Sequence, residues 1–140
     1  MMVTRVEGWE ERLDAVIADA LVRPYVLGEH DCFRMACEVM EVVIGVDRWK
    51  EFAGKYQTRR QAERLLAVHG STFEEAGDWF FKTPHVPPAQ ARRGDICCVE
   101  TEDKVKHLGI CIGKHTALLG PDGLVFLPTL GLRCAWRIGD

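Results

Sequence analysis

The apolar periodicity of this chain changes after a cluster of three prolines, Pro84, Pro87 and Pro88. Before the cluster, apolar residues recur every three or four positions, which is the spacing of amphipathic helices. After it come short runs that alternate or are rich in strand-forming residues, among them 95–99 and 107–113. Helices followed by strands predict an α+β domain in which N-terminal helices pack on a small antiparallel sheet.

The length of 140 residues fits one domain, 1–140, with a helical part at about 5–82 and a sheet part at about 94–138. The net charge of −3 argues against a nucleic-acid-binding protein, which usually carries a basic surface. No signal peptide is apparent at the N-terminus, and no apolar run reaches the length of a membrane span. We therefore expect synthesis in a reducing cytoplasm, free thiols and no membrane partner.

Four helices are expected before the prolines, at about 9–21, 32–44, 58–69 and 72–80. Asp31 can cap the second of them, because a short carboxylate accepts hydrogen bonds from the free backbone N–H groups of a first helical turn. Gly45 is placed to end the same helix. The third begins with a capping box at 58–61.

Cys32 therefore occupies the first position of the second helix. The positive end of the helix dipole stabilises a thiolate there and lowers the pKa of the thiol, provided that the charge of Asp31 does not cancel the effect. Because the thiolate is the nucleophilic form, Cys32 is a candidate for covalent catalysis. Alternatively, Cys32 acts as a small buried apolar residue at the start of a core helix.

The strand at 107–113 offers a possible base. Strict alternation places Leu108, Ile110 and Ile112 on one face, which reads as core, and His107 with Gly109 on the other. A glycine two residues after the histidine would leave the imidazole room to meet another group. The alternative is a solvated histidine at the start of a strand.

Together these features resemble the NlpC-type cell-wall peptidases, a papain-like family. The resemblance rests on Tyr25, Asp31-Cys32 at a helix start, Gly94-Asp95 before a strand, and the strand 107–113. It extends from about residue 25 to 113 and continues weakly to the C-terminus. It implies a papain-like, NlpC-type α+β fold, and compact members with long helical inserts occur in phage and prophage tail gene clusters.

The resemblance implies a cysteine hydrolase that cleaves peptide amide bonds of bacterial peptidoglycan. Cys32 would be its nucleophile, His107 its general base and later acid, and Tyr25 would lie near the nucleophile. No cofactor and no metal are expected. The expected partners are a peptidoglycan stem peptide and phage tail or baseplate proteins, for a protein made in the bacterial cytoplasm and carried on the virion.

Two positions depart from the family pattern. Phe33 and Arg34 stand where the family has small residues, and we expect their bulk to narrow or reshape the cleft. The family also places a polar residue on the strand after the histidine, to orient the imidazole, and the matching stretch 117–120 has none. His115, Thr116 or Asp122 would have to take that role.

A site without an orienting residue loses much of its rate. The alternative function is therefore a catalytically weak or inactive homologue that serves as a structural tail, baseplate or tail-assembly protein. An unrelated cytosolic thiol hydrolase remains a third hypothesis.

Metal binding is the rival chemical interpretation of the six cysteines. No Cys-x-x-Cys pair occurs, and the spacings match no zinc or iron–sulfur signature. Neighbouring Cys97 and Cys98 must point to opposite faces of a strand, which disfavours a shared closed site. Cys37, Cys97, Cys98 and Cys134 are therefore expected to fill the core, while Cys111 shares the face of His107 and stays open.

Overall fold

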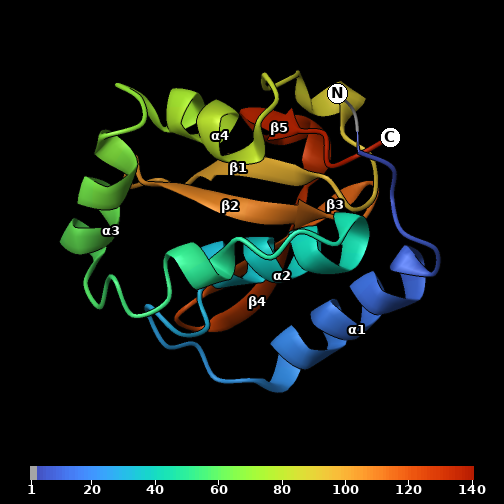
Figure 1. Cartoon of the computed structure of the whole chain (residues 1–140), viewed down its shortest axis with the longest axis horizontal. Helices are drawn as coiled ribbons and strands as arrows, with labels where there is room; N and C mark the ends of the chain where they lie inside the picture. The colour runs from blue at the N-terminus through green and yellow to red at the C-terminus, as the bar shows by residue number, and fades with distance from the viewer. Residues whose placement is uncertain (1–2) are drawn as a thin grey trace.

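The structure is a computed structural model that describes residues 3–140 (Figure 1). Four α-helices come first in the described part: α1 Trp9–Val22, α2 Cys32–Ile44, α3 Arg59–Ala67 and α4 Phe73–Phe81. Five strands follow: β1 Ile96–Glu100, β2 Lys106–Cys111, β3 His115–Gly120, β4 Gly123–Pro128 and β5 Cys134–Trp136. Three 3₁₀ turns connect these elements: η1 Trp49–Glu51, η2 Pro88–Gln90 and η3 Thr129–Gly131.

The strands form one antiparallel sheet in the order β4-β3-β2-β1-β5. The prediction of an α+β domain, helices first and an antiparallel sheet after, is confirmed. Strand β3 pairs with β4 over its whole length but with β2 only at Ile110 and Cys111. The first half of β2 therefore has no strand neighbour on its β3 side.

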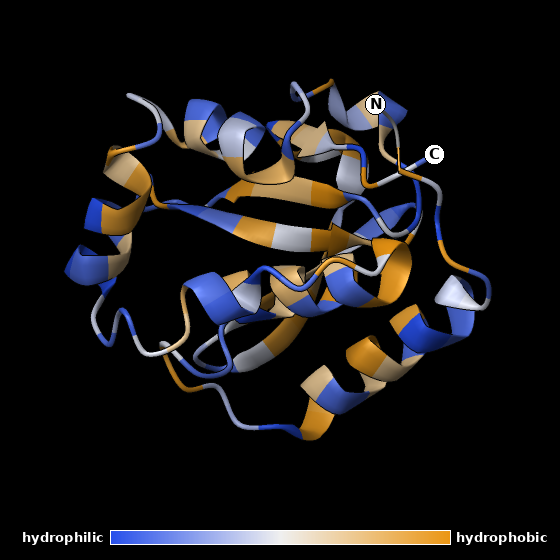
Figure 2. Cartoon of the chain, in the orientation of Figure 1, coloured by the Kyte–Doolittle hydropathy of each residue, from blue (hydrophilic) through white to orange (hydrophobic). Residues whose placement is uncertain are grey.

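The sheet separates two apolar layers. Leu108 and Ile110 belong to the main core, together with the buried face of α2 and with Phe80 of α4. Cys97 and Cys111 belong to a smaller cluster on the other face. The alternation predicted for 107–113 is thus confirmed. Figure 2 shows β1 and most of β2 as hydrophobic and the start of β2 as hydrophilic.

The caps predicted for α2 and α3 are present. Asp31 accepts a hydrogen bond from the backbone N–H of Arg34, and Gly45 ends α2 with a φ of 74° in the left-handed region, where glycine is favoured. Thr58 and Gln61 form a complete capping box at the start of α3. These local signals fixed where the helices begin because they satisfy backbone groups that the helix itself leaves free.

The Gly94-Asp95 pair has a structural role at the entrance to β1. Asp95 is fully buried and accepts hydrogen bonds from the side chains of Arg5 and Arg92 and from the backbone N–H of Ile138. Gly94 has a φ of 93°. The carboxylate thus joins both ends of the chain to the central sheet.

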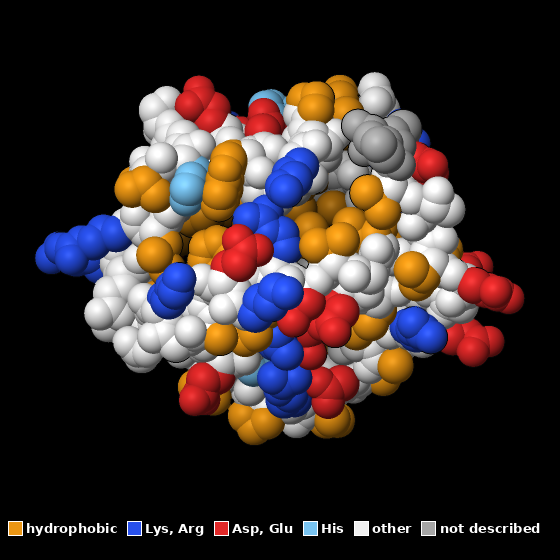
Figure 3. All heavy atoms as spheres, viewed as in Figure 1, with side chains coloured by type: hydrophobic (Ala, Val, Ile, Leu, Met, Phe, Trp, Pro, Cys, Tyr) orange, Lys and Arg blue, Asp and Glu red, His pale blue; other side chains and the backbone are white. Residues whose placement is uncertain are grey.

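No helix within residues 3–140 is long and apolar enough to cross a lipid bilayer. On the face of the molecule seen in Figure 3, lysine and arginine side chains lie beside acidic ones and do not form a continuous basic area.

Candidate active site

Asp31 organises the start of α2. Its carboxylate is buried and accepts hydrogen bonds from the backbone N–H of Arg34 at 2.8 Å and that of Gly28 at 2.9 Å. The hydroxyl of Tyr56 donates a third bond at 2.6 Å. Because both carboxylate oxygens are bonded, the capped turn is held in one position, and Cys32 begins the helix as predicted.

Cys32 is the one cysteine of the chain that is not buried. Its thiol nevertheless lies in a packed environment, and this burial raises its pKa to about 11. The backbone N–H groups of Leu108, Cys32 and Phe33 lower the pKa, while the charge of Asp31 raises it further. The expectation of a lowered thiol pKa is therefore wrong, because desolvation outweighs the helix terminus. At neutral pH Cys32 therefore carries a protonated thiol and not a thiolate.

His107 lies on the first half of β2 and is half-buried. Burial lowers the pKa of its imidazole, and the charge of Arg59 lowers it further, while Asp103 opposes both effects. At neutral pH the ring is therefore uncharged and can accept a proton. Its Nε2 atom lies 3.4 Å from the hydroxyl oxygen of Thr101.

The sulfur of Cys32 lies at the backbone N–H of Leu108, the residue that follows His107 on β2. The N–H of Cys111 points toward β1, where it donates to Asp95, so alternation directs the N–H of Leu108 toward the side that β3 leaves open. That N–H acts on the sulfur of Cys32. Within residues 3–140 no hydrogen bond joins this sulfur to the His107 ring. Catalytic hydrogen bonds are often long before substrate binds.

Gly109 was expected to leave room for the His107 imidazole, but its own surroundings are filled. A Cβ atom at this position would lie 2.6 Å from the Thr116 methyl carbon and 3.2 Å from the Ala117 carbonyl oxygen. The small residue therefore permits close packing between β2 and β3 and does not leave space for the His107 ring.

The other two predicted site residues lie in different places. Tyr25 is half-buried, and its pKa is raised by burial and then by the nearby Cys32 and Asp31. It is therefore a neighbour of Cys32. His115 lies opposite Ile112, because the N–H of Ile112 donates to its carbonyl oxygen at 2.9 Å. That is about 13 Å along the strand from Leu108, so His115 is not brought to Cys32.

Phe33 and Arg34 are accommodated away from the β2 side. Phe33 packs in an aromatic cluster with Trp49, Tyr56, Phe52 and Phe80. The guanidinium of Arg34 lies over the Trp49 ring, 5.1 Å from its centroid. The Phe33 side chain thus joins the core around η1.

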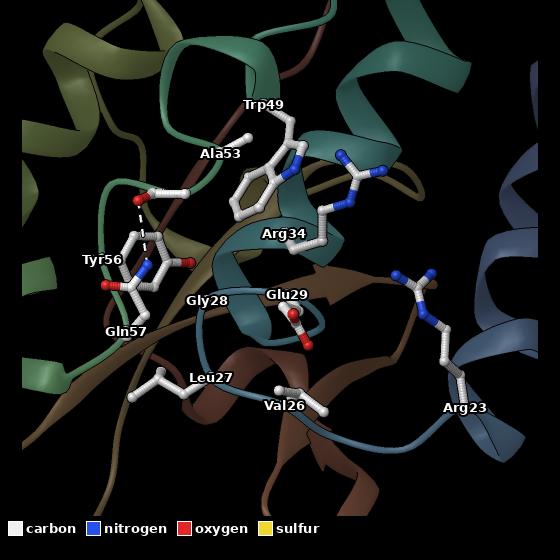
Figure 4. A pocket seen from close by; sticks show the side chains of 11 residues that line it. Arg23, Val26, Leu27, Gly28, Glu29, Arg34, Trp49, Ala53, Tyr56 and Gln57 are labelled. Atoms are coloured by element: carbon white, nitrogen blue, oxygen red, sulfur yellow. Dashed lines mark hydrogen bonds between the residues drawn. The ribbon is translucent and has the colours of Figure 1, made fainter.

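A groove of about 540 Å³ adjoins the capped turn (Figure 4). Gly28, Arg34 and Tyr56, which all bond to Asp31, line it together with Trp49. Neither Cys32 nor His107 is among its lining residues. The groove is therefore separate from the sulfur, and Arg23 and Arg34 contribute positive charge to its lining.

The remaining cysteines are buried, which confirms the expectation for Cys37, Cys97, Cys98 and Cys134. Cys111 is buried as well, with its thiol beside that of Cys97, and Cys98 lies beside Cys134. Within residues 3–140 no group of three or more histidine, cysteine, aspartate or glutamate residues is arranged to hold a metal ion.

Sequence reasoning missed three polar residues of the site. The hydroxyl of Tyr56 donates to the carboxylate of Asp31. Thr101 and Asp103 lie in the turn before β2, whereas an orienting residue was expected after it. Their position six and four residues before a histidine at the start of a strand is a usable signal, since a tight hairpin returns such residues to the same end of the sheet.

One protein family matches the chain over residues 4–138, and it is described as a domain of unknown function (DUF6950). No curated protein matches the chain.

Proposed function

The chain belongs to the DUF6950 family, and we propose that it is an NlpC-type cysteine hydrolase acting on peptide amide bonds of bacterial peptidoglycan. We further propose that it works in association with a phage or prophage tail. The tail setting and the substrate rest on the sequence resemblance. A papain-like, NlpC-type arrangement of the α+β fold forms part of the same proposal.

The observation that carries the proposal is the contact of the Cys32 sulfur with the backbone N–H of Leu108, the residue that follows His107 on β2. Within residues 3–140 Cys32 is the only cysteine residue that is partly exposed, and backbone N–H groups of Leu108, Cys32 and Phe33 face its sulfur. Papain-like hydrolases need this combination of a thiol at a helix start, a nearby imidazole and free backbone donors.

The thiol and the imidazole are both neutral at rest, which determines the order of the proton transfers. His107 takes the thiol proton as the sulfur of Cys32 attacks the amide carbonyl carbon. The N–H groups of Cys32 and Phe33 stabilise the oxyanion that forms. When the C–N bond breaks, the imidazolium returns its proton to the departing amine. A water molecule, deprotonated by His107, then hydrolyses the thioester.

The test is release of new amino groups from purified peptidoglycan and from synthetic stem peptides. Wild-type protein should cleave both, and Cys32→Ala and His107→Gln should each abolish cleavage. Cys37→Ala removes a buried thiol on the same helix and serves as the matched control, which should retain activity. An inert wild type, or cleavage that survives in Cys32→Ala, would refute the hydrolase.

A structural tail or baseplate protein is the second candidate function. The raised thiol pKa and the missing bond between Cys32 and His107 favour it. So does the edge strand β4, which exposes 48% of Val125 and 44% of Phe126. Incorporation of the inert Cys32→Ala protein into tails with unchanged yield of infectious particles would support this role and would separate it from catalysis.

A further inference from the structure

The turn between β1 and β2 is a closed hairpin loop at the His107 end of the sheet. The N–H of Thr101 donates to the Val105 carbonyl oxygen at 2.9 Å, and the N–H of Lys104 donates to the Thr101 carbonyl oxygen at 2.9 Å. Lys104 has a φ of 67°, so the chain reverses sharply there. These bonds hold the Thr101 side chain at the base of the loop, next to the start of β2.

The Thr101 hydroxyl touches three groups but has only one proton. Its oxygen is hydrogen-bonded to the carboxylate of Asp103, lies 3.1 Å from the Val105 carbonyl oxygen, and lies 3.4 Å from Nε2 of His107. The bond from Thr101 lowers the pKa of Asp103, so this group is a carboxylate at neutral pH and can only accept. A charged acceptor is preferred over a neutral carbonyl, and the hydroxyl proton therefore points to Asp103.

With its proton directed to Asp103, the Thr101 oxygen presents a lone pair to the ring. It can then bond Nε2 of His107 only if Nε2 carries the hydrogen. That tautomer leaves Nδ1 unprotonated, and Nδ1 is the nitrogen free to accept a proton from another direction.

We propose that Thr101 and Asp103 are positioning residues that hold His107 as its Nε2–H tautomer, leaving Nδ1 as the acceptor for the Cys32 thiol proton. The transfer of the Cys32 proton to Nδ1, the catalytic part of this inference, rests on the proposed hydrolase. The preference of His107 for the Nε2–H tautomer does not depend on that activity. The pair takes the role for which residues 117–120 of β3 offer no polar side chain, and it does so from the turn that precedes β2.

A purely structural role for Asp103 must be distinguished, since its carboxylate also lies 3.4 Å from the N–H of Val105. The direct readout is the ¹⁵N chemical shifts of the His107 ring, recorded at about pH 8, where the ring is neutral. A His107→Gln variant assigns the signals among the five histidines. Wild-type protein should show the Nε2–H tautomer.

Thr101→Val removes the hydroxyl at constant shape and should give a mixture of tautomers, whereas Thr101→Ser should restore the wild-type shifts. Asp103→Asn should also weaken the preference, because an amide side chain can donate to the hydroxyl. Glu102→Gln is the matched control in the same loop and should change nothing. A wild-type Nδ1–H tautomer, or shifts unchanged in Thr101→Val, would overturn the inference.

Kinetics test the catalytic part. Thr101→Val should lower kcat on stem peptides about tenfold or more with little change in KM, within the range that general acid–base catalysis contributes. Melting temperatures of all variants exclude unfolding as the cause. If the tautomer responds as expected but wild type cleaves nothing, the positioning role stands and the hydrolase fails. If wild type cleaves and Thr101→Val cleaves equally well, the catalytic part of the inference is overturned.

Discussion

The hydroxyl of Tyr56 donates a 2.6 Å hydrogen bond to Asp31, the residue that caps the helix carrying Cys32. Tyr56 lies between η1 and α3, so this bond joins the long connection after α2 back to the start of that helix. The segment between α2 and α3 thus helps to hold the start of α2, and with it the Cys32 thiol, in position.

Tyr56→Phe should therefore destabilise the fold by about 1–3 kcal/mol, because a buried carboxylate loses a hydrogen bond from a buried donor. Chemical denaturation followed by fluorescence would measure the change. Tyr25→Phe is the control, since within residues 3–140 the Tyr25 hydroxyl makes no hydrogen bond. Equal effects of the two substitutions would contradict the assigned role of Tyr56.

Alkylation of Cys32 should be slow at pH 7 and should rise steeply as the pH approaches 11, because burial raises the thiol pKa to about that value. Cys32 should still react before the other five thiols, which are all buried. Iodoacetamide labelling at several pH values, with peptide mapping by mass spectrometry, gives both results. Fast labelling at pH 6 to 7 would instead show a stabilised thiolate.

The His107 imidazole should titrate below its usual range, since burial and then Arg59 lower its pKa. Arg59→Gln should raise the pKa by removing a positive charge, and Asp103→Asn should lower it by removing a negative one. An NMR titration of the ring would measure both shifts. Arg60→Gln, an exposed neighbour on α3, should have a smaller effect than Arg59→Gln.

Acid stability should depend on Glu74 at the start of α4. Burial would raise the pKa of this carboxyl, but hydrogen bonds from Lys106 and Arg133 lower it to about 2. A depressed folded-state pKa stabilises the protein above the unfolded value of 4.5 and loses that contribution as the pH falls toward 2. Glu74→Gln should therefore flatten the decline in the free energy of unfolding across this window. An unchanged slope would show that the two cations do not act on Glu74.

The helical half and the identity of the strands were predictable from the sequence because local signals determine them. Caps at Asp31, Gly45 and Thr58 satisfy backbone groups within a few residues, and the alternation after His107 reports one buried face. The strand order was not predicted, because the pairing of β5 with β1 depends on contacts between distant segments.

The electrostatics of the site were the least predictable part. The helix terminus at Cys32 is visible in the sequence, but the burial of the thiol that overrides it follows only from the tertiary packing. The Thr101 contact with His107 likewise needs the geometry of a hairpin. Tyr56 gave no signal beyond its aromatic character, since its partner Asp31 lies far away in sequence.

The buried Asp95 carboxylate holds Arg5 and the backbone of Ile138 at the same time, and the N–H of Asp140 donates to the Val3 carbonyl oxygen at 2.9 Å. Both termini therefore leave the molecule at one corner, opposite α3 and the β1–β2 turn (Figure 1). An affinity tag or carrier attached to either end would anchor the molecule by that corner and leave the thiol-bearing end facing outward. A short linker between residues 3 and 140 would close the chain into a cyclic protein, with the linker at this same corner.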